Sequence, residues 1–216
     1  PLVFPGNDEP GVMLSASVRQ FLRRFAVAAG ESVAVVTNND DAYETAIALH
    51  DAGISVACLA DVRTEAPSAL AKNLTTRNIE LLLGAQVLRT EGKRKLHGAV
   101  IRADGRDRHF ACDVLAMSGG FNPSVHLFTQ SGGKAVYDAT LACFVPGAAL
   151  QAQSSVGAAA GVFSLSQSLK DGHQAGLAAA AVCGFDASNA TLATPYAAED
   201  EPGKPIKAHW GSGKRK

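Results

Sequence analysis

Residues 31–63 constrain the fold of this chain more than any other stretch. They contain two apolar runs, at 32–36 and 55–60, of the kind found in strands that are buried on both faces of a sheet. Between these runs, residues 40–51 place small and apolar side chains along one face of a helix, and Gly53 follows as a left-handed cap. A strand, a helix and a strand in so short a span predict a right-handed βαβ unit on a parallel sheet.

The turn between the first strand and the helix lacks the chemistry of a dinucleotide site. Such a turn needs glycines so that backbone N–H groups reach the pyrophosphate, and residues 37–41 read Thr-Asn-Asn-Asp-Asp. Asp40 or Asp41 is the expected N-cap, and both suit the positive end of the helix dipole. A pyrophosphate about 5 Å from either carboxylate would meet a repulsion of about 3 kcal/mol at an effective dielectric of about 20. We therefore predict that this turn is scaffold, although Asp61 stands where a ribose-binding acid would.

The pattern changes after a short helix predicted at 66–76 and a third parallel strand predicted at 79–83. Short strands separated by turn signals follow, at 86–90, 98–103 and 108–111. This spacing predicts an antiparallel meander attached to the parallel sheet.

A further apolar strand at 113–117 ends on Ser118, Gly119 and Gly120. Glycines at the carboxyl end of a buried strand allow a ligand to approach the backbone closely, and a plain turn would need them as well. Pro123 is expected at the first position of a short helix.

A second small-residue loop, at 153–161, leads into a long helix predicted at 162–182. Because this loop contains no carboxylate, it is the better candidate for contact with an anionic nucleotide. An amphipathic helix is also expected at 12–25, and a strand pair or an extended segment at 134–144.

Charge and composition argue against several classes of partner. The 20 basic residues balance the 20 acidic ones, so neither nucleic acid nor a membrane surface is expected as a partner. We expect no signal peptide and no bilayer-spanning run. The spacing of the four cysteines fits no metal site and predicts small buried thiols in a reducing cytoplasm: Cys58, Cys112, Cys143 and Cys183. No Ser/His/Asp or Cys/His arrangement is specific enough to name catalytic residues.

Four stretches together carry a resemblance to a known family. They read VVTNNDDAYETA at 35–46, CDVLAMSGGFNPSVHLFTQSGGK at 112–134, FVPG at 144–147 and SSVGAAAGVFSLSQSLKDG at 154–172. They resemble the alpha subunit of heterotetrameric sarcosine oxidase, and the similarity extends along the whole chain. Residues 118–134 are its most specific part.

The resemblance implies an α/β fold of the pyridine-nucleotide disulfide oxidoreductase type. This is a three-layer β/β/α, FAD/NAD(P)-binding-like domain with a parallel sheet and an antiparallel meander. It implies that 1–25 and 111–185 are parts of a split first dinucleotide-binding domain, and that 26–110 is an inserted second NAD(P)-binding-like domain. Residues 186–216 are then a linker to a missing C-terminal domain, so we expect the chain to be a piece of a longer protein.

The resemblance also implies a function. Enzymes of this family oxidatively demethylate sarcosine to glycine, with oxygen as electron acceptor and folate as acceptor of the one-carbon unit. The chain is then one component of an oxidoreductase, inactive by itself, whose partners are the other subunits of the heterotetramer and a small-molecule substrate. Two alternatives stay open: an alpha-type subunit of a related amine or opine dehydrogenase, and a non-catalytic assembly module with a degenerate dinucleotide fold.

In such a subunit NAD is bound by the first dinucleotide-binding domain, and FAD and FMN belong to the assembled complex. The implied NAD contacts are made through the backbone, where the split first domain returns to the nucleotide. They are Ser118, Gly119, Gly120, Gly157 and Gly161.

Overall fold

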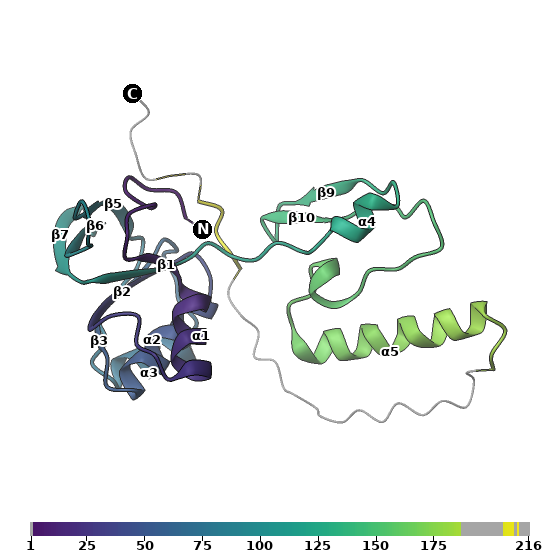
Figure 1. Cartoon of the computed structure of the whole chain (residues 1–216), viewed down its shortest axis with the longest axis horizontal. Helices are drawn as coiled ribbons and strands as arrows, with labels where there is room; N and C mark the ends of the chain where they lie inside the picture. The colour runs from purple at the N-terminus through teal and green to yellow at the C-terminus, as the bar shows by residue number, and fades with distance from the viewer. Residues whose placement is uncertain (1, 187–204, 210, 212–216) are drawn as a thin grey trace. The chain divides into compact units, whose positions relative to one another are not determined.

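The computed structural model describes residues 2–186, 205–209 and 211, and it divides into two compact units (Figure 1). Unit 1 comprises Pro1–Gly120 and Gly203–Lys216, and unit 2 comprises Phe121–Pro202. The predicted linker at 186–216 lies largely outside the described residues.

A five-stranded parallel sheet forms the centre of unit 1. Its order is β1-β8-β2-β3-β4, and every neighbouring pair is parallel. The strands are β1 (Val12–Leu14), β8 (Val114–Ser118), β2 (Ser32–Thr37), β3 (Ser55–Asp61) and β4 (Leu81–Leu82). The predicted βαβ unit is confirmed, because β2 and β3 pair in parallel and α2 (Asp41–Asp51) connects them. Gly53 has a φ of +79° just beyond this helix, as expected of a left-handed cap.

Helices cover one face of this sheet. They are α1 (Ser15–Phe25), α2 and α3 (Ser68–Thr75). Because side chains alternate along a strand, Val33 and Val35 of β2 point into a core shared with Val18 of α1 and Leu49 of α2. We call this set the helix-side core.

An antiparallel meander covers the other face. It consists of β5 (Gln86–Glu91), β6 (Gly98–Ala103) and β7 (Arg106–Ala111), in that order. Ala34 and Val36, the intervening residues of β2, pack in a second core with Ile101 and Phe110 of the meander. Meander, parallel sheet and helices are the three layers of the predicted β/β/α fold, which is thereby confirmed.

The first predicted helix was placed wrongly at its start. Residues 12–14 form strand β1 at the edge of the sheet, and α1 begins at Ser15. The reason is the neighbouring β8, whose backbone pairs with Val12, Met13 and Leu14. The strand conformation of 12–14 thus depends on main-chain pairing with a distant strand, which the side-chain pattern of 12–25 does not indicate.

Strand β8 lies between β1 and β2, inside the sheet that contains the predicted inserted domain. The structure thus divides the chain at Gly120, whereas the sequence-based division was placed at 25/26 and 110/111. The assignment of 1–25, 26–110 and 111–185 to two dinucleotide-binding domains stays a prediction.

Unit 2 contains one long helix and several short elements. They are α4 (His126–Gln130), the antiparallel pair β9 (Ala135–Asp138) and β10 (Cys143–Pro146), the 3-10 turn η1 (Gly157–Ala160) and α5 (Leu165–Val182). The expected strand pair is present, but the two predicted helices start later than expected. Helix α4 begins at His126, so Pro123 is not its first residue, and α5 begins at Leu165 because the Ser164 hydroxyl accepts a hydrogen bond from Gln167 N–H. No residue of α5 is buried, so the predicted packing of its apolar face is not seen among the described residues.

Three of the four cysteines are buried, as predicted, but Cys183 is exposed at the end of α5. Burial raises the pKa of the Cys112 thiol to about 11. Among the described residues, no helix has the length and apolar character needed to cross a membrane.

The substitution Val35→Ala tests the layered core. Val35 is fully buried, so we expect the free energy of unfolding of unit 1 to fall by about 2 kcal/mol through lost burial and an unfilled cavity. Val27→Ala is the matched control at a side chain that is 49% exposed, and we expect it to change stability by less than about 0.5 kcal/mol. Urea denaturation measures both, and equal losses would contradict the assigned core.

Candidate functional site

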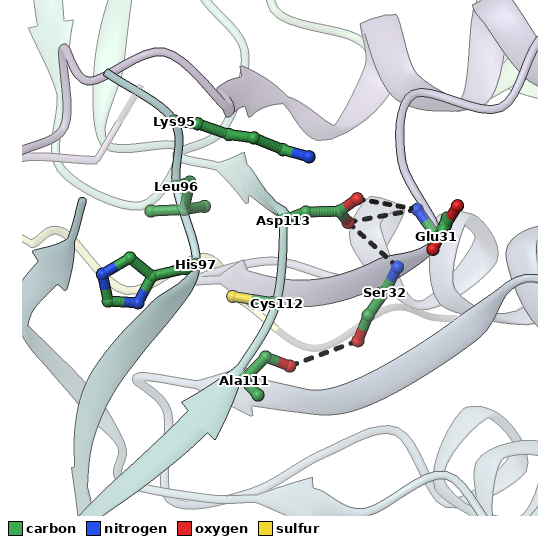
Figure 2. Close-up of a pocket in the computed structure, with 8 residues that line it drawn as sticks. All are labelled: Glu31, Ser32, Lys95, Leu96, His97, Ala111, Cys112 and Asp113. Atoms are coloured by element: carbon green, nitrogen blue, oxygen red, sulfur yellow. Dashed lines mark hydrogen bonds between the residues drawn. The ribbon is translucent and has the colours of Figure 1, made fainter. Parts of the chain in front are cut away.

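One cavity of unit 1 lies at the amino ends of its strands. It has a volume of about 530 Å³ and is lined by residues of three segments: Glu31, Ser32, Lys95, Leu96, His97, Ala111, Cys112 and Asp113 (Figure 2). The Asp113 carboxylate accepts hydrogen bonds from the backbone N–H groups of Glu31 and Ser32 at 3.0–3.1 Å. Burial acts to raise the pKa of Asp113, but these N–H donors outweigh it and hold the pKa below its usual value. The carboxylate therefore ties the start of β2 to the start of β8.

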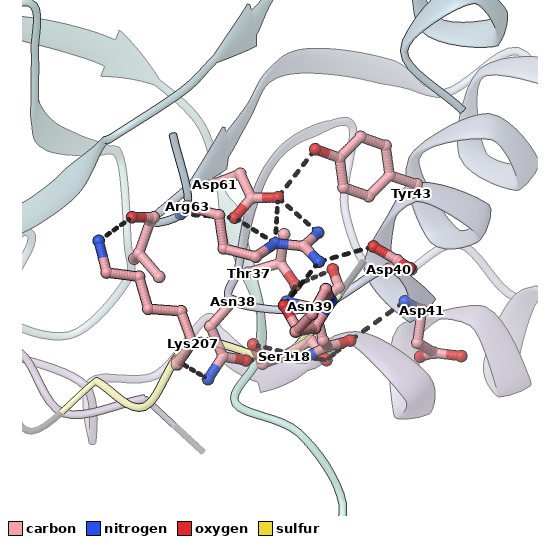
Figure 3. A network of polar contacts seen from close by, with 12 residues as sticks. Thr37, Asn38, Asn39, Asp40, Asp41, Tyr43, Asp61, Arg63, Ser118 and Lys207 are labelled. Atoms are coloured by element: carbon pink, nitrogen blue, oxygen red, sulfur yellow. Dashed lines mark hydrogen bonds and ion pairs between the residues drawn. The ribbon is translucent and has the colours of Figure 1, made fainter. Parts of the chain in front are cut away.

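Ligands of open α/β sheets bind at the opposite side, outside the carboxyl ends of the strands. In unit 1 the three central strands β8, β2 and β3 end there at Ser118, Thr37 and Asp61. We call this region the carboxyl edge (Figure 3). It includes the turn at 37–41, where a dinucleotide-binding fold would hold the pyrophosphate.

Arg63 lies at the carboxyl edge and forms ion pairs with two carboxylates there. Its guanidinium lies 2.7 Å from an Asp61 oxygen and 2.7 Å from an Asp40 oxygen. The side chains of Arg63 and Asp61 are 6% and 0% exposed, so this ion pair is removed from water. Burial acts to lower the pKa of Arg63, but its bonds to Asp61 and Asp40 outweigh burial and raise it, so the guanidinium stays charged.

Tyr43 completes the environment of Asp61. Its hydroxyl donates a hydrogen bond of 2.8 Å to Asp61 Oδ2, from the first turn of α2. Burial and the neighbouring carboxylate raise the pKa of Tyr43 far above its usual value, so the phenol keeps its proton. The acid that would bind a ribose hydroxyl is thus occupied by Arg63 and Tyr43. These two side chains with Asp40 and Asp61 are the ion-pair network.

Side-chain hydrogen bonds of Asn39 hold the turn at 37–41 in place. Asn39 donates to the Ser118 hydroxyl at 2.9 Å, and Asn39 Oδ1 accepts from Asp41 N–H at 3.1 Å. Asp40 stands at the N-cap position of α2, as predicted, but its carboxylate makes no cap bond, and Asn39 accepts from the first helical N–H instead. Asp40 makes no side-chain cap bond because its carboxylate is turned to Arg63.

The repulsion expected from the two carboxylates is also corrected. Asp41 lies 2.6 Å from Arg19 of α1, and Asp40 is paired with Arg63. Each negative charge thus has a positive partner from another element. These side chains fill the space that a pyrophosphate would need. Their occupation of that space opposes binding more than the charge of the two carboxylates does, because each carboxylate is paired with an arginine.

Among the predicted nucleotide contacts, Ser118, Gly119 and Gly120 lie at the carboxyl edge. Ser118 is buried and exchanges hydrogen bonds with the Asn39 side chain. Gly120 has a φ of +90°, and a Cβ at this position would overlap the side chain of Ile206. The backbone conformation and the Ile206 side chain therefore explain why a glycine is needed at position 120.

The other two predicted contacts, Gly157 and Gly161, lie in unit 2 at the start and the end of η1. They have φ values of +59° and +88°. A Cβ at Gly161 would crowd the side chains of Val145 and Leu141, whereas the space beside Gly157 is ordinary. Both lie in the loop that precedes α5, as expected from the sequence.

The residues of unit 1 do not fit a dinucleotide at the carboxyl edge. The turn has no glycine, its first helical N–H is bonded to Asn39, and the ribose-binding acid is paired with an arginine. We therefore assign no nucleotide-binding site to the carboxyl edge.

Arg63, Tyr43 and Arg19 are the residues that sequence reasoning missed. Arg63 stands two positions after Asp61, which is the one local signal in the sequence. Its second partner, Asp40, is 23 positions away and becomes its neighbour through the parallel pairing of β2 with β3.

Two solved structures share the fold of this chain. The chain is similar to the solved structure of L-proline dehydrogenase from P. horikoshii, with a TM-score of 0.61 and 20% identity over 86% of this chain and 33% of that one. It is also similar to T. acidophilum thioredoxin reductase, with a TM-score of 0.51 and 16% identity over 75% of this chain and 57% of that one. These structures show that the fold is of the FAD/NAD(P)-binding oxidoreductase type. No protein-family model matches the chain.

Sequence similarity identifies a narrower group. The chain is 39% identical to sarcosine oxidase subunit alpha of Corynebacterium sp. strain P-1 over 194 residues, which is 86% of this chain and 20% of that protein. It is 37% identical to the subunit of the same name in Rhizobium meliloti strain 1021, over 80% of this chain and 17% of that protein. The resemblance inferred from the motifs is confirmed: the chain is related to a segment of sarcosine oxidase alpha subunits. It spans about a fifth of the length of these relatives.

Substitution of Arg63 tests the ion-pair network. Arg63→Met leaves Asp61 buried without its counter-charge, so we expect the free energy of unfolding to fall by about 3–5 kcal/mol. The matched control is Arg102→Met, which breaks an exposed pair with Asp107 and should change stability little. Chemical denaturation compares the two, and a small loss for Arg63→Met would show that the pair is not held away from water.

Proposed function

We propose that this chain is part of the alpha-type subunit of a sarcosine oxidase. The observation that carries the proposal is the 39% identity to such subunits over 86% of the chain. The assembled flavoenzyme oxidatively demethylates sarcosine to glycine, with oxygen as electron acceptor and folate as acceptor of the one-carbon unit. The chain contributes dinucleotide-binding scaffold to this oxidoreductase and is inactive alone.

In this proposal NAD is bound by the first dinucleotide-binding domain, to which 1–25 and 111–185 contribute. Its proposed backbone contacts in this chain are Gly157 and Gly161. Ser118, Gly119 and Gly120, also expected from the sequence, lie at the filled carboxyl edge and are left out of the proposal. The positive φ of Gly157 and Gly161 supports backbone approach there, because a side chain is disfavoured in that conformation. FAD and FMN belong to the complete complex.

The partners in this proposal are the other subunits of a heterotetramer, and the location is the cytoplasm. The assembly with other subunits is supported by the relatives, whose names mark them as subunits. The cytoplasmic location is supported by the described cysteines, all of which are free thiols.

One observation favours a structural role for unit 1 within that subunit. Its carboxyl edge is filled by the ion-pair network, so in this proposal the inserted domain at 26–110 binds no nucleotide itself. Its role is then to hold other parts of the protein together. This agrees with the second alternative, an assembly module with a degenerate dinucleotide fold. An alpha-type subunit of an amine or opine dehydrogenase differs from the main proposal in substrate and in electron acceptor.

The test is the substrate of the complete complex that contains this chain. We expect the purified complex to consume sarcosine and to release one hydrogen peroxide per sarcosine, and added tetrahydrofolate to lower the free formaldehyde. A preparation without this subunit is the control. Oxidation of an opine or another secondary amine, with sarcosine untouched, would contradict the proposal in favour of a related dehydrogenase. A complex that oxidises none of them would favour the assembly module.

A further inference from the structure

A segment distant in sequence lies along the carboxyl edge of unit 1. Residues 205–207, Pro-Ile-Lys, make main-chain and side-chain contacts with the residues that follow β2, β3 and β8. Figure 3 shows Lys207 beside Asn38 and the ion-pair network. We call these three residues the docked segment.

Asn38 pairs with the backbone of the docked segment. The N–H of Lys207 donates to the Asn38 carbonyl at 3.2 Å, and Asn38 Nδ2 donates to the Lys207 carbonyl at 2.8 Å. Asn38 is 3% exposed, so its amide is a buried group that needs such a partner. Both bonds recognise an extended backbone whatever its side chains are.

Two further contacts lie at the end of β3. The Lys207 ammonium donates to the Val62 carbonyl at 3.0 Å, and Arg63 Nη1 donates to the Pro205 carbonyl at 3.4 Å. The Lys207 ammonium is thus held at the residue that lies between Asp61 and Arg63 in the sequence.

Ile206 accounts for the shape of the edge at β8. Its side chain occupies the space where a Cβ on Gly120 would lie, so a larger residue at 120 would displace the segment. The docked segment therefore touches the positions after three adjacent strands, namely Gly120, Asn38 and Val62. This is the path along which open α/β sheets bind their ligands.

We propose that the carboxyl edge of unit 1 is a docking site for an extended peptide, and that its occupant is residues 205–207 of this chain. Asn38 binds the backbone of Lys207, the Val62 carbonyl binds its ammonium, Arg63 binds the Pro205 carbonyl, and Gly120 makes room for the isoleucine. The site holds the chain segment where a nucleotide would otherwise lie, and it fixes the point at which the chain returns to unit 1.

Amide hydrogen exchange of the whole chain tests the proposal. We expect the Lys207 amide to exchange at least about tenfold more slowly than in an unstructured peptide of the same sequence, because it donates to Asn38. Ile206→Ser should remove most of this protection. Ala208→Ser, at the exposed neighbouring residue, is the matched control and should retain it. All rates are corrected for the intrinsic exchange of each sequence.

Tryptic cleavage after Lys207 gives an independent readout. Docking holds the Lys207 side chain on the Val62 carbonyl, so we expect cleavage to be slow in the parent and in Ala208→Ser and at least several-fold faster in Ile206→Ser. Exchange of the parent amide at the free-peptide rate would overturn the proposal. Equal cleavage of Ile206→Ser and Ala208→Ser would overturn it as well.

Discussion

The contact of Arg63 with Asp40 and Asp61 is the interaction on which the carboxyl edge depends. Asp61 has no exposure to solvent, and an unpaired carboxylate there would cost several kcal/mol. Arg63 supplies the counter-charge and Tyr43 adds a hydrogen bond. Since Asp40 opens the crossover helix and Asp61 ends the next strand, one guanidinium joins the two halves of the βαβ unit. The place of a ribose and a pyrophosphate is thereby taken by side chains of the protein.

The rest of unit 1 is arranged around this edge. Helices and meander bury the two faces of the sheet and leave its strand ends as the region where polar groups gather. The turn after β2 satisfies its own amides through Asn39, and the docked segment uses the remaining Asn38 side chain. Internal contacts thus fill the edge of the sheet at which open α/β folds bind their ligands, which agrees with the proposed scaffold role.

The layers were predictable from the sequence, because strands and helices leave periodic patterns. The runs at 32–36 and 55–60 and the stripe of 40–51 became β2, β3 and α2. Strand β1 was missed, since three residues are too short to show a period and β8 decides their conformation. The missing glycines identified 37–41 as scaffold, but the reason was incomplete. Arg63 and Arg19 meet their carboxylates only after the chain has folded, and no local pattern carries that information.

An NMR titration of the chain with NAD, following the amides of Asn38, Asp41 and Arg63, tests most directly whether protein groups occupy the carboxyl edge in place of a nucleotide. We expect these resonances to stay in place up to about 1 mM NAD, a concentration that corresponds to a binding free energy of about −4 kcal/mol. Saturable shifts at these three amides at micromolar NAD would contradict it, because a nucleotide would then displace the ion-pair network.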